Sequence, residues 1–420
     1  MSVYTYRNSQ LWVESVPFEH LAREYGTPLY VYSKRTLLDD LRRIESAFEG
    51  IPHLTYYAVK ANANRVLLQT VAGEGLGADA GSKGELYLAL TAGFAPNKIT
   101  FSGVGKRDDE IAYALDHRIL AFYVESTEEI EVINQIAGEK GMRAAILLRV
   151  NLDIDAGGHA YVSASMKHNK FGVPHGSALD VLRWASGLPH VDVRGIHSHI
   201  GSQILRPMTF LRAAEAVADV VHKLRAGGVP VHELDFGGGF GVQYHGYVSH
   251  PELPNEVSEA PTISSAVLLR PALQVLQELD CNISIQPGRA LVAHAGVLLT
   301  RILYRKETAT KTFLIVDGAM TDLIRPSLYH AHHQIVPLEL NHAPHETVDV
   351  VGPVCESSDF LAQDRVLPRM QRNDNLAVMC AGAYGFAMAS TYNARPRIAE
   401  VLVDGDTHTV IRPRERIEDL

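Results

Sequence analysis

Short apolar runs alternate with helix-spaced apolar positions between about residues 54 and 286. The runs predict eight strands: Leu54–Lys60, Leu76–Ala80, Lys98–Ser102, Leu120–Val124, Ala144–Asn151, Val193–His199, Val231–Phe236 and Asn282–Gln286. Between them apolar residues recur every three or four positions, as in Phe210, Ala214, Val217, Val221 and Leu224. This spacing predicts a helix, which we expect to end at Gly227-Gly228, shortly before Pro230.

Strands that alternate with helices predict a parallel sheet, because parallel strands need crossover connections. Eight such units favour an α/β fold with a closed (β/α)8 TIM barrel, and an open Rossmann-like sheet is the alternative. After residue 290 the runs become β-like with Pro and Gly punctuation: Gly296–Tyr304, Thr312–Asp317, Thr347–Val351, Asn375–Cys380 and Glu400–Val403. We expect a barrel over residues 33–286, followed by a mainly β C-terminal domain over 287–420. Residues 1–32, which include the strand-like run Leu29–Tyr32, are expected to join that domain.

The composition is that of an ordinary globular protein. The chain has 420 residues, which makes two domains the default expectation. A net charge of −9 and the lack of a long Lys/Arg run argue against nucleic acid or an anionic membrane as a partner. No apolar stretch of signal-peptide or membrane-spanning length is evident, and the three cysteines are too scattered for a disulfide framework or a zinc site. We therefore expect a cytoplasmic protein.

Reactive side chains follow several predicted strands, where barrel enzymes place their sites. Lys60 ends the first strand, and a lysine held by a mostly buried strand can act as an amine nucleophile. Asp79 lies near the end of the second strand. Gly237-Gly238-Gly239 follows the seventh strand, where backbone amides can surround a phosphate, and Gln286-Pro-Gly-Arg289 follows the eighth. The structural alternatives are a solvated lysine and a flexible glycine turn.

His197 and His199 lie two apart and share a face if the strand continues through them. Metal binding through this pair is one interpretation, but further ligands for a full site are not evident nearby. Simple packing among barrel side chains is another. His199 is nearer the expected mouth, where an imidazole stacked on a cofactor ring suits the Gly-Ser202-Gln that follows.

The β domain carries two further sets of polar residues. Arg325 and Tyr329 offer a guanidinium and a phenol for a carboxylate, although for this segment alone an ordinary surface arginine beside a packed tyrosine is the simpler interpretation. Cys355-Glu356 pairs a thiol with a carboxylate, and buried inert cysteine is the alternative there. Tyr384, flanked by glycines, predicts either a tight turn or a cofactor contact.

Taken together, these segments resemble the diaminopimelate decarboxylases, barrel-type enzymes that use pyridoxal 5'-phosphate. The resemblance rests on motifs in family order along nearly the whole chain: Tyr57-Ala-Val-Lys-Ala-Asn62, Phe101-Ser-Gly-Val-Gly-Lys106, Asn169-Lys-Phe-Gly172, His197-Ser-His-Ile-Gly-Ser-Gln203, Gly237-Gly-Gly239, Pro287-Gly-Arg289, Arg325-Pro-Ser-Leu-Tyr329, Cys355-Glu-Ser-Ser-Asp-Phe360 and Ala383-Tyr-Gly-Phe386. It implies decarboxylation of meso-2,6-diaminopimelate to L-lysine and CO2, by a homodimer with shared active sites.

The resemblance also implies a role for each matching residue. Lys60 would bond the cofactor aldehyde, His199 would stack on its ring, and Cys355 would be the proton donor. The implied cofactor-binding set is Lys60, Asp79, His199, Ser202, Gly238, Gly239, Gln286, Gly288, Arg289 and Tyr384. The implied substrate-binding set is Arg289, Arg325, Tyr329, Glu356 and Tyr384. In this family the cysteine and glutamate reach the site from the partner subunit.

One residue departs from the family pattern. The family normally has a glutamate where this chain has Gln286, and that carboxylate keeps the pyridine nitrogen protonated. An amide cannot supply the negative charge, so we expect a weaker electron sink and a gain in decarboxylation from Gln286→Glu. Two alternatives follow: a decarboxylase or racemase for another amino acid on the same scaffold, and a non-catalytic cofactor-binding regulator.

Overall fold

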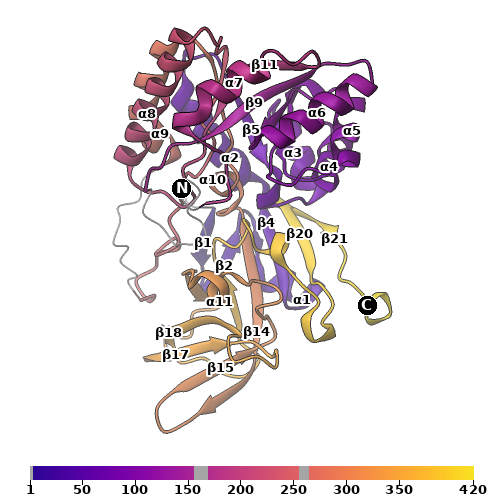
Figure 1. Cartoon of the computed structure of the whole chain (residues 1–420). Coiled ribbons are helices and arrows are strands. Elements are labelled where there is room, and N and C mark those ends of the chain that lie inside the picture. The colour runs from indigo at the N-terminus through magenta and orange to yellow at the C-terminus, as the bar shows by residue number, and fades with distance from the viewer. Residues whose placement is uncertain (1–2, 156–168, 255–263) are drawn as a thin grey trace. The chain divides into compact units, whose positions relative to one another are not determined.

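The computed structural model describes residues 3–155, 169–254 and 264–420 (Figure 1). The chain divides into two compact units. The barrel unit comprises Arg42–Gly241 and Ile263–Ala290, and the β-rich unit comprises Met1–Leu41, Val242–Thr262 and Leu291–Leu420.

The barrel unit is built on eight parallel strands: β5 (His53–Ala58), β6 (Gly77–Ala80), β7 (Ile99–Phe101), β8 (Ala121–Val124), β9 (Ala144–Asn151), β11 (Val191–His197), β12 (Glu233–Asp235) and β13 (Asn282–Ile285). Each pairs with the next, and β13 pairs with β5, so the ring is closed. A short strand, β10 (Val173–Pro174), extends the pairing from β9. The closed ring confirms the predicted TIM barrel and rules out the open sheet.

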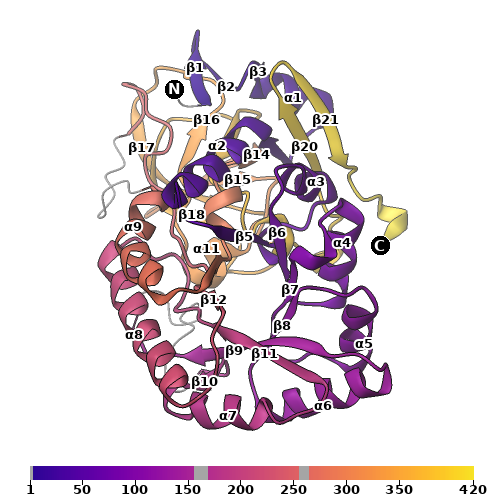
Figure 2. The same cartoon turned by 90° about the horizontal axis from the view of Figure 1, so that it is seen from above.

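Helices follow the strands and lie outside the ring (Figure 2). They are α3 (Arg65–Gly73), α4 (Lys83–Ala92), α5 (Asp108–Asp116), α6 (Thr127–Glu139), α7 (Ala178–Ala185), α8 (Pro207–Ala226) and α9 (Ser265–Leu276). The predicted stripe of α8 is buried, and the helix ends before Gly227 as its sequence indicates. Serine hydroxyls cap α4 and α6 by accepting the Glu85 and Glu129 amides. Among the described residues, no helix combines the length and the hydropathy that crossing a membrane requires.

Several predicted strands end earlier than the sequence indicated, and three of them carry residues of the predicted site or lead into them. Leu54–Lys60 is β5 only to Ala58, because Val59–Ala61 is a 3-10 turn closed by the Asn62 amide on the Val59 carbonyl. Val193–His199 is β11, which ends at His197. Val231–Phe236 is β12 over three residues only. Lys60, His199 and the glycines after β12 therefore lie on turns beyond the strands, whereas Asp79 lies within β6.

The β-rich unit contains a large sheet that joins both ends of the chain. Its strands are β4 (Leu29–Ser33), β14 (Gly296–Glu307), β15 (Thr312–Val316), β16 (Ile335–Pro337), β17 (His345–Val351), β18 (Phe360–Pro368), β19 (Asn375–Val378), β20 (Ala399–Asp404) and β21 (Thr407–Arg412). β4 lies between β14 and β20, so the N-terminal segment supplies a central strand of this sheet. A small sheet of β1 (Tyr4–Arg7), β2 (Gln10–Val13) and β3 (Val16–Pro17) precedes helix α1 (Phe18–Tyr25).

The unit boundaries differ from those expected from the sequence. Residues 242–254, assigned to the barrel by pattern, belong to the β-rich unit. The Gln334 side chain holds this segment by exchanging two 2.8 Å hydrogen bonds with the backbone of Val248. Helix α2 (Lys34–Glu45) begins in the β-rich unit and ends in the barrel unit, whereas α10 (Arg289–Val292) crosses in the opposite direction.

Candidate active site

The carboxyl ends of the parallel barrel strands gather most of the predicted site residues at one mouth. Lys60 follows β5, Asp79 is in β6, and His199 with Ser202 follows β11. Gly238 and Gly239 follow β12, and Gln286, Gly288 and Arg289 follow β13. The parallel direction of the strands is what brings these separate segments to the same edge.

The glycine loop after β12 is in backbone contact with its neighbours. A Cβ on Gly238 would overlap the carbonyl of Gln286, and one on Gly239 would overlap the carbonyl of Gly201. Gly239 also has φ +97°, a conformation that side-chain-bearing residues rarely adopt. Glycine is therefore required at both positions, and a loop without side chains is the kind of backbone that can bind a phosphate.

His199 is held as a neutral ring. The backbone N–H of Gly238 donates a 3.2 Å hydrogen bond to its Nδ1, so Nδ1 is an acceptor and the proton is on Nε2. Burial lowers the pKa of His199 well below its ordinary value, and the nearby charges of Arg149 and Lys60 lower it further. A neutral imidazole suits a stacking role and does not suit the role of a cationic proton donor.

Lys60 is exposed on the 3-10 turn after β5, which corrects the expectation of an amine held by a mostly buried strand. The oppositely charged group that interacts with Lys60 is Asp79. Asp79 is a buried carboxylate that accepts hydrogen bonds from Ser102 Oγ at 2.5 Å and Thr100 Oγ1 at 3.0 Å. Burial raises the pKa of Asp79, while the Lys60 ammonium lowers it. An accessible amine next to a fixed acid is well placed to condense with an aldehyde.

Asp235 is a candidate that the sequence analysis did not select. Its carboxyl is fully buried and accepts hydrogen bonds of 2.6 Å from the Tyr123 hydroxyl and from the Gly237 amide. Burial raises the pKa of Asp235 to about 7, and the two hydrogen bonds act in the opposite direction. The only signal in the sequence was an acid at a strand end immediately before three glycines.

The segment after β13 presents an amide and a guanidinium. Arg289 is buried and donates through Nη2 to Ser202 Oγ at 3.0 Å, so two predicted residues meet. Gln286 is also buried, and its Nε2 has no hydrogen-bond partner among residues 3–155, 169–254 and 264–420. Gly288 packs against the Cβ atoms of Ala58 and Ala61, which ties this segment to the turn that carries Lys60.

The β-rich unit holds the predicted arginine clamp. Arg325 starts helix α11 (Arg325–Tyr329) and is buried, so the simpler interpretation of a surface arginine is wrong. Its Nη1 lies 2.8 Å from His333 Nε2, and its guanidinium lies 4.7 Å from the ring centre of Tyr244. His333 Nδ1 lies 2.9 Å from the Met379 carbonyl and so carries the proton, which leaves Nε2 as the acceptor. His333 and Tyr244 were missed, since nothing in their sequence spacing links them to Arg325.

The remaining predicted residues lie on loops of the β-rich unit. Cys355 and Glu356 are exposed, which excludes the buried inert cysteine, and the Cys355 amide donates to Asn393 Oδ1 at 2.8 Å. Buried Asp359 shapes this loop by accepting the Val354 amide at 2.7 Å. Tyr384 is half-buried with φ +56°, a conformation often found at functional sites when a non-glycine residue adopts it.

A family model and two similar proteins point to the same protein family. The family model for the pyridoxal binding domain of pyridoxal-dependent decarboxylases matches residues 34–293. The diaminopimelate decarboxylase of Vibrio cholerae is 45% identical, covering 100% of this chain and 98% of the relative. That of Aquifex aeolicus is 42% identical, with 98% and 95% covered.

Solved structures that resemble this chain are also diaminopimelate decarboxylases. Diaminopimelate decarboxylase from Helicobacter pylori complexed with L-lysine has a TM-score of 0.89 at 40% identity, covering 96% of this chain and 98% of that one. The enzyme from M. jannaschii in co-complex with L-lysine has a TM-score of 0.92 at 32% identity, with 99% and 96% covered. The barrel and its lysine-bearing mouth thus define a pyridoxal-dependent decarboxylase. Within that class, the chain belongs to the diaminopimelate decarboxylase family.

The residues present fit pyridoxal 5'-phosphate. Side chains at Gly238 and Gly239 are excluded by the carbonyls of Gln286 and Gly201, so the loop keeps the bare backbone that an anion cradle requires. Lys60 supplies the accessible amine. The buried Nε2 of Gln286 is a donor without a partner among the described residues, which suits the nitrogen of a pyridine ring. These three features would meet the phosphate, the aldehyde and the ring nitrogen of the cofactor, in that order.

Proposed function

We propose that this chain decarboxylates meso-2,6-diaminopimelate to L-lysine and CO2, the final step of lysine biosynthesis. The observation that carries the proposal is the position of Lys60 at the same barrel mouth as neutral His199 and the glycine loop. Pyridoxal phosphate, when bound, supplies an aldehyde that condenses with amines and a ring that withdraws electrons from the α-carbon. The residues of the chain then bind, orient and exchange protons.

The barrel residues would hold the cofactor. Lys60 Nζ would be the amine that holds the aldehyde. The backbone amide of Gly239 would receive the phosphate, while Gly238 belongs to the set through the hydrogen bond that its amide donates to His199. His199 presents a neutral face for stacking, and Asp79 fixes the charge near Lys60. Ser202, Gln286, Gly288 and Arg289 complete the cofactor set, with Tyr384 from the β-rich unit.

The substrate chemistry explains why cations and an anion are both needed. Diaminopimelate has an amino acid group at each end, so the end that does not react is a zwitterion. Arg289 and Arg325 suit its carboxylate, Glu356 suits its ammonium, and Tyr329 and Tyr384 add hydroxyls. Ornithine, which lacks the second carboxylate, would need only the anion. The buried position of Arg325 supports the clamp, because a buried guanidinium is retained where a partner anion offsets its desolvation.

Cys355 would protonate the α-carbon after CO2 leaves. Its thiol and the Glu356 carboxylate are both exposed, as groups that act across a subunit interface would be in a single chain. We therefore propose a homodimer in which each subunit lends these two residues to the other. A cytoplasmic location is part of the same proposal and rests on the composition.

The test measures both activity and the covalent bond. CO2 release is followed from meso-diaminopimelate, ornithine and lysine with added pyridoxal phosphate, and we expect release from the first alone. Borohydride reduction followed by peptide mapping should place the pyridoxyl mass on Lys60. Lys60→Ala should lose the label and the activity. Lys83→Ala, which removes an exposed lysine paired with Asp109, is the matched control and should keep both.

Each alternative has its own outcome. Release from ornithine or lysine in place of diaminopimelate indicates a sister decarboxylase. Interconversion of enantiomers without gas indicates a racemase. A labelled Lys60 with no turnover of any substrate indicates a cofactor-binding regulator. A pyridoxyl label on another residue contradicts the proposal itself.

A further inference from the structure

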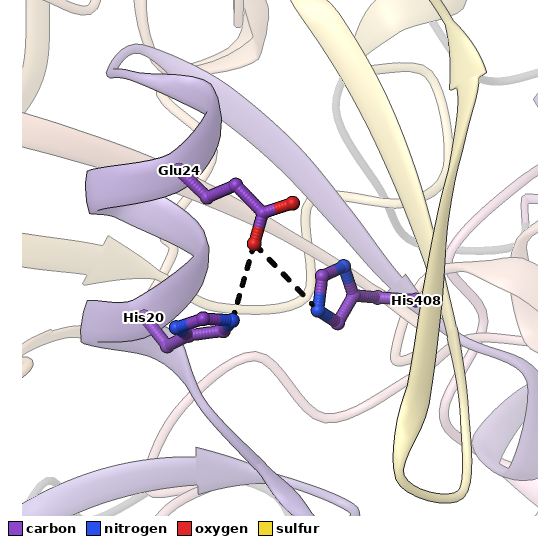
Figure 3. A group of neighbouring side chains, drawn as sticks. All are labelled: His20, Glu24 and His408. Carbon is purple, nitrogen blue, oxygen red and sulfur yellow. Dashed lines mark ion pairs between the residues drawn. The ribbon is translucent and has the colours of Figure 1, made fainter.

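A second group of side chains in the β-rich unit has no part in the proposed function. His20 and Glu24 come from α1, and His408 comes from β21 (Figure 3). Glu24 Oε2 lies 3.1 Å from His20 Nε2 and 3.8 Å from His408 Nε2. Ligand atoms of all three lie within 4.8 Å of one another. Two segments from opposite ends of the chain thus bring two imidazoles and a carboxylate together.

The helix presents two of these groups by its spacing. His20 and Glu24 are four residues apart, so they lie one turn apart on the same face of α1. The other face is anchored in the core by Phe18, Leu21 and Ala22. Burial of that face directs the pair outward, where water and ions have access.

His408 is oriented by a neighbouring phenol. The Tyr25 hydroxyl lies 2.7 Å from His408 Nδ1, which leaves Nε2 directed at Glu24. The ring also packs edge-on against His20, with centroids 5.4 Å apart and planes at 69°. When His408 binds a metal through Nε2, its Nδ1–H donates to the Tyr25 oxygen, as the second nitrogen of a ligand histidine commonly does.

The backbone that carries the ligands is fixed independently of them. β4 follows α1 directly and pairs in parallel with β20, which forms a hairpin with β21. Arg414 donates to the Pro28 carbonyl at 2.7 Å, so the chain after the hairpin is tied to the chain after the helix. The three ligands therefore start close together, and binding an ion requires only side-chain rotation.

We propose that His20, Glu24 and His408 bind a divalent transition metal ion of the zinc class. Imidazole and carboxylate ligands favour Zn²⁺, Co²⁺, Ni²⁺ or Cu²⁺ over Mg²⁺ or Ca²⁺. Bonds of about 2.0–2.2 Å in a tetrahedral site place ligand atoms roughly 3.4 Å apart, close to the separations from Glu24. Water takes the fourth position. The ion joins the N-terminal helix to the C-terminal hairpin and stabilises the folded unit.

The test uses the full-length, cofactor-loaded protein, purified without a histidine tag and dialysed against a chelator. It is titrated with Co²⁺, whose visible absorption reports four-coordinate binding, and with Zn²⁺ by calorimetry. The variants are His20→Ala, Glu24→Gln, His408→Ala and Tyr25→Phe. The matched control is His342→Ala, which removes another exposed histidine paired with a glutamate, Glu252, at 2.6 Å.

We expect one bound ion per chain that is absent or at least tenfold weaker in each ligand variant. Tyr25→Phe should weaken binding by roughly 10- to 100-fold, as loss of a contact that orients a ligand does. Zn²⁺ should raise Tm in the wild type and in His342→Ala. It should not raise Tm in Glu24→Gln, where the side chain keeps its shape but loses its negative charge. Equal stoichiometry and affinity in wild type and all three ligand variants would overturn the proposal, as would equal loss in His342→Ala. Because the readouts are binding and Tm, the result does not depend on decarboxylase activity.

Discussion

The amide of Gly238 donates a hydrogen bond of 3.2 Å to Nδ1 of His199, which joins the loop after β12 to the loop after β11. This contact assigns the tautomer of the ring, because an acceptor nitrogen carries no proton. It is consistent with an uncharged imidazole at a position where the charges of Arg149 and Lys60 also lower the pKa of the His199 ring.

We predict that His199 does not titrate near neutral pH. Burial lowers the pKa of His199 well below its ordinary value, so the folded ring should still be neutral at the pH near 6.5 where an unfolded histidine gains a proton. Stability contributed by the neutral ring is therefore present above pH 6.5 and lost as pH falls, because the unfolded state binds more protons there. Nitrogen-15 spectra of labelled protein, assigned with His199→Asn, measure this directly. A titration midpoint near 6.5 for the assigned ring would refute it.

Asp235→Asn should change the pH dependence of stability. Burial raises the pKa of Asp235 to about 7, so the folded chain keeps a proton that the unfolded chain releases near pH 4. The stability contributed by this proton declines as pH rises between these values. Relative to wild type, the variant should gain about 1 kcal/mol per pH unit between pH 5 and 7, measured by urea unfolding. Asp116→Asn, at an exposed acid paired with Lys140, is the control. A constant difference across this range would be the contrary result.

Gln286→Glu should increase decarboxylation by roughly tenfold, equivalent to about 1.4 kcal/mol of barrier, because a carboxylate favours a protonated pyridine nitrogen. Without cofactor the same change buries a charge and should lower Tm, so pyridoxal phosphate should raise Tm more in the variant than in wild type. Gln274→Glu, on the exposed side of α9, controls for added charge. Unchanged or lower kcat would count against the assigned role of Gln286.

Arg325→Lys should raise KM for diaminopimelate at least tenfold with a smaller effect on kcat. Lysine keeps the charge but loses the planar fork that meets a carboxylate and the donor to His333. Steady-state kinetics separate the two parameters. Arg365→Lys is a matched control, because Arg365 pairs with His332 at 3.0 Å in the same unit. If Arg365→Lys changed KM and kcat as much as Arg325→Lys does, the change in KM would come from a general loss of packing and not from a lost substrate contact.

Cys355 should be the thiol that alkylation inactivates. It is exposed, whereas Cys380 is fully buried and burial raises the pKa of Cys281. Iodoacetamide followed by peptide mapping should modify Cys355 first, in step with loss of activity. Cys355→Ala should lower kcat by roughly 10²- to 10⁴-fold, the usual contribution of a proton donor. Cys281→Ala should leave kcat unchanged, and inactivation that tracks Cys281 instead would contradict the assignment.

The sequence by itself determined the barrel, because strand and helix periodicities are local and each parallel strand requires a crossover. It also identified Lys60, the glycines after β12 and the Gln286–Arg289 segment, since residues at strand ends of a parallel barrel must share one mouth. The strand-like Leu29–Tyr32 run was enough to predict that the N-terminus enters the second unit.

Only the tertiary structure decided features that depend on contacts between distant segments. Ala58 and Ala61, at the turn that carries Lys60, lie close to Gly288 from the other end of the barrel sequence. The two residues that contact Arg325 are His333 and Tyr244, which come from segments that no periodicity relates to it. The pKa of Asp235 depends on its depth in the barrel, which composition does not encode. Burial and hydrogen bonding are properties of neighbours in space, so the chemistry of these residues appeared only when the chain was folded.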